Sequence, residues 1–232
     1  MRKINLLPVL VIAICPLFLN AQDVNTLVQK IKAKLDRVSD YEASGKMKTN
    51  VTFLKVPIAN IKLYYKKPDK VRIKNEKGFS FIPKGAVNIN MSNSLNNGKY
   101  SVLDAGVDKI DGVVVRVVKL LPDDDNADVV LSTLYIDETN LVIRKSKTTT
   151  RENGSYELQM SYGKYADYGL PDKIIFSFNT KDYKLPKGVS FDFEDGSEAK
   201  NAADKTKNKK GRAEITFTSY NINKGVADTI FL

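Results

Sequence analysis

Residues 41–53 read Tyr-Glu-Ala-Ser-Gly-Lys-Met-Lys-Thr-Asn-Val-Thr-Phe, and small or apolar side chains alternate with polar ones throughout this segment. Successive side chains of a β-strand point to opposite faces, so the alternation predicts a strand with one dry face and one wet face. A sheet that is solvated on one side is typical of antiparallel pairing. The segment therefore predicts a mainly antiparallel β protein.

Similar segments follow along the chain, and turn residues such as Lys67-Pro68-Asp69 separate them. Short connections favour antiparallel neighbours in sequence order, which is a meander. Residues 83–111 fit the pattern less well, and we expect a short helix or lid within them. The further predicted strands are 58–66, 70–75, 78–82, 112–121, 129–137, 140–150, 155–164, 172–180, 187–194 and 212–222.

One amphipathic helix is predicted before the sheet. Its apolar residues follow helical spacing, and Asp23 is a suitable N-cap. The apolar positions are Val24, Leu27, Val28, Ile31, Leu35 and Val38. About eleven strands form a sheet that must curl, and an unclosed sheet needs a cover over its concave apolar face. We therefore predict an α+β fold: an unclosed half β-barrel, covered by helix 24–38 and a short lid, with an apolar cavity between the layers.

The N-terminal segment 1–21 has the organisation of a cleavable signal peptide. A basic start is followed by the apolar run 6–19 and by Ala21. This run is shorter than the roughly 20 residues that span a bilayer. We therefore predict export to the periplasm and a single domain, 22–232. A lipid anchor at Cys15 is the alternative, although Ile14 stands where a lipoprotein signal has a small residue.

Residues 22–232 contain no cysteine, histidine or tryptophan. Thiolate or imidazole catalysis and His/Cys metal sites are thereby excluded, and we expect neither an enzyme nor a cofactor. The acidic run at 123–125 lacks the glycine and distal glutamate of a calcium loop, so we expect a solvated turn and no metal.

The polar segment 195–211 is expected to be a mobile loop. Its lysines lack interleaved aromatic residues, so nucleic acid is not an expected partner; we expect a monomer.

Three segments together carry a family resemblance. They are Leu35–Ser44 (LDRVSDYEAS), Ile61–Ile73 (IKLYYKKPDKVRI), and Leu134–Asp137 followed by Leu141 and Ile143. In order and spacing they resemble the outer-membrane lipoprotein carrier (LolA-type) family, over most of the chain to about residue 178. The resemblance implies an unclosed antiparallel barrel whose concave face is covered by helices. It also implies that the cavity binds lipoprotein acyl chains or other lipid.

The resemblance assigns candidate site residues. The hydrophobic cavity would be lined by Leu35, Tyr41, Ile61, Leu63, Tyr65, Val71, Ile73, Leu134 and Ile136. Apolar alternation does not separate a cavity lining from ordinary core, so that alternative is equally weighted. Where the family carries an arginine that holds the lid shut, this chain has Lys67 before Pro68. We expect Lys67 to act as the lid latch, with one compact charge in place of a planar fork.

The resemblance also implies a function. A periplasmic carrier would bind acyl chains and transfer them towards the outer membrane, with an inner-membrane donor protein and an outer-membrane acceptor protein as partners. The alternative is a non-catalytic interaction or regulatory module of the envelope, which contacts a membrane-protein partner through a sheet edge or the basic loop. The sequence leaves open which lipid is bound and whether 187–232 completes the half-barrel.

Overall fold

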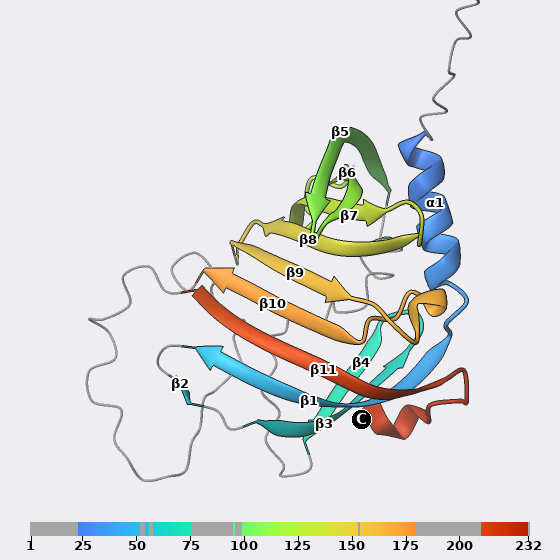
Figure 1. Cartoon of the computed structure of the whole chain (residues 1–232), viewed down its shortest axis with the longest axis vertical. Helices are drawn as coiled ribbons and strands as arrows, with labels where there is room; N and C mark the ends of the chain where they lie inside the picture. Colours follow the sequence, from blue (N-terminus) through green and yellow to red (C-terminus); the bar gives the residue numbers. More distant parts are fainter. Residues whose placement is uncertain are drawn as a thin grey trace, which may run out of the picture.

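The structure is a computed structural model, shown in Figure 1. It describes residues 23–51, 54–55, 58–75, 95, 99–152, 154–179 and 210–231. The predicted signal peptide 1–21, the predicted strands 78–82 and 187–194 and nearly all of the predicted loop 195–211 lie outside the described residues. The described part is one antiparallel sheet curled around a single α-helix, α1 (Val24–Leu35).

The strands pair in the order β4-β3-β1-β11-β10-β9-β8-β7-β6-β5, and the short β2 pairs with β1. They are β1 (Asp40–Val51), β2 (Leu54–Lys55), β3 (Ala59–Lys66), β4 (Lys70–Asn75), β5 (Tyr100–Ile110), β6 (Val113–Pro122), β7 (Val129–Asp137), β8 (Val142–Thr150), β9 (Ser155–Ser161), β10 (Lys173–Asn179) and β11 (Lys210–Ile222). Among the described residues β4 and β5 do not pair with each other, so the barrel stays open. The predicted half-barrel is confirmed.

The last strand, β11, lies in the middle of the sheet. It pairs with β1 on one side, from Tyr41 opposite Ile222 to Asn50 opposite Arg212, and with β10 on the other. The C-terminal strand therefore joins the two meanders, β1–β4 and β5–β10, into one layer. This answers part of the question that the sequence left open, because within 187–232 the described strand β11 completes the half-barrel, while the predicted strand 187–194 lies outside the described residues.

A bulge between Ser44 and Gly45 interrupts the pairing of β1 with β11. A β-carbon at Gly45 would lie 2.6 Å from the backbone oxygen of Thr216, so no larger residue fits without moving the neighbouring strand. Bulges bend a strand and increase its twist. Gly45 thus contributes to the curl of the sheet around α1.

One strand was not predicted from the sequence. Residues 100–110, placed within the segment expected to hold a short helix or lid, form the edge strand β5. All side chains from Leu103 to Lys109 are exposed, and a bulge lies between Asp104 and Val107, so no apolar alternation marks this strand. The expected lid falls on residues that the structure does not describe, apart from Leu95. That residue is helical and is buried in the core.

Helix α1 begins where the sequence predicts, since Asp23 accepts a hydrogen bond from the Thr26 amide at 3.3 Å. It ends three residues earlier than expected, at Leu35, because Asp36 caps it and the chain then turns into β1. Figure 1 shows α1 at the end of the sheet where β7 turns into β8. In the described part of the chain, no helix combines the length and hydropathy needed to cross a bilayer.

The hydrophobic core lies between α1 and the inner, concave face of the sheet. The buried face of the helix consists of Val24, Leu27, Val28 and Ile31. Alternation on β7 shows the two faces of the sheet, because Leu134 and Ile136 belong to this core while Thr133 and Tyr135 point outward. Burying one large aliphatic side chain contributes about 1.5–3 kcal/mol, so the four helix residues together hold α1 with about 6–12 kcal/mol.

Two ion pairs attach the C-terminal segment to the β3–β4 hairpin. Asp228, in the short helix η3 (Asp228–Phe231), lies 2.8 Å from Lys70 Nζ and 2.9 Å from Lys66 Nζ. Hydrogen bonds from these lysines lower the pKa of Asp228 from 3.8 to about 2. The folded state therefore favours the carboxylate. The stabilisation is fully present above the ordinary pKa and is lost as the pH falls through about 2.

We predict that a carboxyl NMR titration places the midpoint of Asp228 near 2 in the wild-type protein. The pair of substitutions Lys66→Gln and Lys70→Gln should return the midpoint to the ordinary range near 3.8, because both hydrogen bonds are then lost. If the double substitution does not move the Asp228 midpoint, the two ion pairs are not the cause of its low pKa.

Candidate functional site

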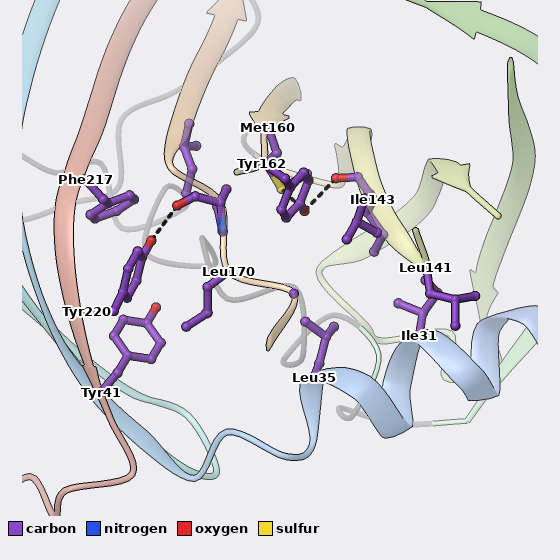
Figure 2. Close-up of a pocket in the computed structure, with 14 residues that line it drawn as sticks. Ile31, Leu35, Tyr41, Leu141, Ile143, Met160, Tyr162, Leu170, Phe217 and Tyr220 are labelled. Atoms are coloured by element: carbon purple, nitrogen blue, oxygen red, sulfur yellow. Dashed lines mark hydrogen bonds between the residues drawn. The ribbon is translucent and has the colours of Figure 1, made fainter. Parts of the chain in front are cut away.

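The candidate site, called here the inner cavity, is an apolar hollow beneath the C-terminal end of α1 (Figure 2). Leu35 and Ile31 reach into it from the helix, and Tyr41 and Tyr220 reach into it from β1 and β11. The lining consists of Ile31, Leu35, Tyr41, Leu141, Val142, Ile143, Met160, Tyr162, Gly169, Leu170, Pro171, Ile174, Phe217 and Tyr220. No charged residue is in this set. The inner cavity therefore suits a hydrocarbon and not an ion.

The connection between β9 and β10, residues 162–172, forms the floor under the helix end. Gly169 has φ +68°, and a β-carbon there would lie 2.8 Å from Leu35 Cδ2. Only glycine combines this backbone conformation with so close an approach. Leu170 and Pro171 follow directly and are buried, so the turn presents apolar side chains to the cavity.

Aromatic rings build the wall towards β1 and β11. The Tyr220 ring centroid lies 5.4 Å from Tyr41, 5.1 Å from Phe217 and 4.9 Å from Tyr165. Tilted and edge-on pairs at such distances add to the stabilisation from burial. Tyr41 also contacts Tyr65, at 5.2 Å. The wall is therefore an aromatic cluster, whereas the opposite side of the cavity is formed by Ile143 and Met160 together with Tyr162.

The hydroxyls of Tyr162 and Tyr220 in the lining donate hydrogen bonds to the backbone. Tyr220 Oη donates to the Pro171 oxygen at 2.7 Å, and Tyr162 Oη donates to the Ile143 oxygen at 2.8 Å (Figure 2). Burial raises the pKa of both phenols far above 10. They are neutral and satisfied at physiological pH, so the surface that they present to the cavity is apolar.

Little of the inner cavity is open space. The lining residues leave a volume of about 20 Å³, which is room for about one water-sized sphere. An acyl chain is much larger than this. A hydrocarbon chain could enter only if Leu35 and the end of α1 moved away from the floor at Gly169–Pro171.

Side-chain contacts attach the helix end to the surrounding loops. Lys34 Nζ donates to the backbone oxygen of Asn140 at 2.7 Å, and the Arg37 guanidinium donates to the backbone oxygen of Asp167. The Asn140 loop is itself held by Asp137, whose carboxylate accepts from Arg144 at 2.8 Å. Burial raises the pKa of Asp137, but its hydrogen bonds with Asn140 and Arg144 outweigh this and lower it overall. These are polar contacts at the rim of an otherwise apolar site.

Lys67 also contacts the helix end. Its Nζ donates to the Asp36 backbone oxygen at 2.6 Å and lies 3.0 Å from Asp36 Oδ1. The position is the C-cap of α1, where a cation is favourable because the last helical carbonyls point there. The side chain is 31% exposed, and it belongs to the turn after β3, not to the cavity lining. The latch role of Lys67 stays a prediction, to which the structure adds this contact.

The structure places the predicted lining residues in two groups. Leu35 and Tyr41 line the inner cavity. The others are in or against the core and are not part of that lining: Ile61, Leu63, Tyr65, Ile73, Leu134 and Ile136 are buried, and Val71 is half-buried. Sequence reasoning missed the contribution of β8–β11. The signal that could have indicated it is Leu170-Pro171, an apolar pair inside a turn that is otherwise polar.

Comparisons with known proteins were made for the sequence and for the fold. No protein-family model matches the sequence, and no curated protein does. Solved structures do match over most of the chain. An outer-membrane lipoprotein-sorting protein domain from Vibrio parahaemolyticus superimposes with a TM-score of 0.55 and 14% identity, over 89% of this chain and 94% of that one. A LolA-superfamily protein from Nitrosomonas europaea gives 0.55 and 11%, over 88% and 97%.

The chain has the LolA-type fold. A third structure agrees: a DUF1329-family protein from Desulfovibrio piger, with a TM-score of 0.53 and 12% identity, over 91% of this chain and 98% of that one. The family resemblance in the sequence is thus confirmed at the level of the fold. In this LolA-type half-barrel the inner cavity lies between the covering helix and the concave face.

Proposed function

We propose that this protein is a periplasmic carrier that binds lipoprotein acyl chains, or another lipid, between α1 and the sheet and transfers them towards the outer membrane. The observation that supports it is the inner cavity, an uncharged hollow beneath a helix end. An inner-membrane protein would donate the ligand and an outer-membrane protein would accept it. No catalytic step is involved, and the chain acts as a monomer after removal of residues 1–21.

The free energy gained by burying an acyl chain is similar in size to the free energy gained by packing α1 on the sheet. This similarity supports transfer of the ligand in place of permanent binding. An acyl chain of about 14 methylenes gains about 11 kcal/mol on burial, before ordering costs. The helix gains about 6–12 kcal/mol from its own four buried side chains. Since the helix and the ligand compete for the same apolar surface, the protein can both take up and release a chain.

The experiment that tests the proposed function is uptake of a fluorescent long-chain fatty acid by the purified, delipidated protein. We expect saturable binding to one site, with release when unlabelled fatty acid is added. Native mass spectrometry of protein isolated from the bacterial envelope should show a lipid adduct. The absence of both fatty-acid binding and an adduct would overturn the proposal.

We predict that Lys67→Ala loosens the helix end. The lost contact is partly exposed, so it contributes about 1 kcal/mol, and the amides of α1 should exchange about fivefold faster. Because the closed helix competes with the ligand, the fatty-acid affinity should rise by a similar factor. Hydrogen exchange and a fatty-acid titration measure the two effects.

The matched control is Lys70→Ala, since Lys70 lies in the same hairpin but contacts Asp228 and not α1. Its helix exchange and fatty-acid affinity should equal those of the wild type. If Lys67→Ala behaves like this control in both measurements, Lys67 is not a latch.

A further inference from the structure

A second hollow, called here the outer groove, lies on the opposite face of the sheet from α1. Its volume is about 480 Å³, which is in the range of ligand-binding pockets. It spans β6, β7 and β8, and residues of β5 form one wall. The lining consists of Ala105, Val107, Asp108, Val117, Lys119, Leu131, Thr133, Tyr135, Lys147 and Thr149.

A cationic row crosses the floor of the outer groove. Lys119 on β6 lies opposite Thr133 on β7, which lies opposite Lys147 on β8. Neighbouring strands are about 4.8 Å apart, so the backbones of Lys119 and Lys147 are about 10 Å apart. The hydroxyl of Thr133 lies between their two side chains. Such a row suits an anion with several oxygen acceptors.

Both lysines of this row are available to a ligand. They are exposed, and neither forms an ion pair within the described part of the chain. The carboxylate closest in register, Glu157 opposite Lys147, is instead paired with Lys145 at 2.9 Å. Asp108 on β5 also belongs to the lining and brings one negative charge, so the two lysines leave the lining with a net positive charge of one.

Two aliphatic side chains and one aromatic ring flank the cationic row. Val117 and Tyr135 lie on one side of it and Leu131 on the other, in the register of β6 and β7. On β5, Val107 of the lining is 64% exposed, and Leu103, which lies opposite Lys119 in register, is 50% exposed. A free small anion would use the lysines but would leave these aliphatic residues in water. An anionic lipid surface uses both, because head groups meet the lysines and aliphatic side chains enter the interface.

We propose that the outer groove is a membrane-docking site that binds the anionic head group of a phospholipid, with Val107 and Leu103 entering the lipid interface. The chain is complementary to such a surface, since its formal net charge of +10 falls only to +8 when residues 1–21, with Arg2 and Lys3, are removed. The site is on the opposite face from the inner cavity and does not depend on what that cavity binds. A chain that docks in this way would hold α1 and the cavity away from the bilayer surface.

The test is flotation of the purified protein with vesicles of phosphatidylcholine alone, or of an equal mixture of phosphatidylcholine and phosphatidylglycerol. We expect binding to the mixed vesicles only. Each lysine at an anionic surface contributes about fivefold, so the pair Lys119→Gln and Lys147→Gln should lose about thirtyfold in affinity. Val107→Ser should lose severalfold, while its thermal unfolding stays unchanged because the side chain is exposed.

The matched control removes the same charge from the same outer face. Lys46 and Lys48 are exposed on β1, which β9, β10 and β11 separate from the groove. The pair Lys46→Gln and Lys48→Gln should bind mixed vesicles like the wild type. Three results would overturn the proposal: no binding of the wild type, equal losses in both double variants, or inorganic phosphate shifting the Thr133 NMR signal while vesicles do not bind. Fatty-acid uptake by the Lys119/Lys147 double variant should be normal, which separates this site from the proposed carrier function.

Discussion

Replacing Leu35 by glutamate is expected to reduce the affinity for a long-chain fatty acid by about a hundredfold or more. The leucine closes the inner cavity against Gly169, and removing its apolar surface loses about 1.5–3 kcal/mol of contact with a bound chain. Taking a carboxylate out of water adds a cost of at least a similar size. Because Leu35 is only half-buried at the end of α1, the fold should tolerate the change. A titration with fluorescent fatty acid measures the loss.

Ala33→Glu is the control for this prediction, since Ala33 is exposed on the same helix and lies outside the cavity lining. It adds the same charge and should change the affinity by less than about threefold, as a surface substitution does. A fatty alcohol used as the probe removes repulsion between two carboxylates, and Leu35→Glu should still weaken its binding. Equal affinities of the Leu35 and Ala33 variants would show that the ligand does not bind beneath the helix end.

The sheet was predictable wherever one face of a strand is buried and the other is wet. The strand β4 was predicted with its observed bounds, 70–75, and β7 with its bounds, 129–137. In both, the polar and apolar positions follow the two faces of the sheet. The strand β5 gave no such signal, because its side chains from 103 to 109 are all exposed. Tyr100 and Val102 pack against the core, but the rest of the strand is held by pairing with β6, which leaves no trace in composition.

The site was predicted less well than the fold, for a physical reason. Residues such as Leu63 and Leu134 alternate as a cavity lining would, yet they pack in the solid part of the core. Alternation shows which face of a strand is inward, but the place where the interior is hollow depends on how the helix end meets the β9–β10 connection. That junction brings Leu35 to Gly169, which are far apart in the sequence. The position of β11 beside β1 likewise depends on long-range pairing.

A cross-link between α1 and the β7–β8 turn is expected to abolish fatty-acid uptake. The proposal requires that the helix end move, because the lining leaves only about 20 Å³. Lys34 Nζ lies 2.7 Å from the Asn140 oxygen, so cysteines at positions 34 and 140 are within reach of a short bifunctional maleimide. The only natural cysteine is Cys15, in the signal-peptide segment. Uptake by the linked protein should be slowed at least about a hundredfold, since opening would break the link or the core.

A spacer that contains a disulfide makes this test reversible, because reductant cuts the link and should restore uptake in the same sample. A monofunctional maleimide on both cysteines controls for modification alone. Cysteines at positions 42 and 62 control for cross-linking elsewhere, since the Glu42–Lys62 ion pair, at 2.8 Å, joins β1 to β3 and leaves the helix untouched. If the protein linked at 34 and 140 takes up fatty acid as fast as these controls, α1 is not the moving cover. The ligand would then have to enter by another route, such as the open side of the half-barrel, where β4 and β5 do not pair with each other.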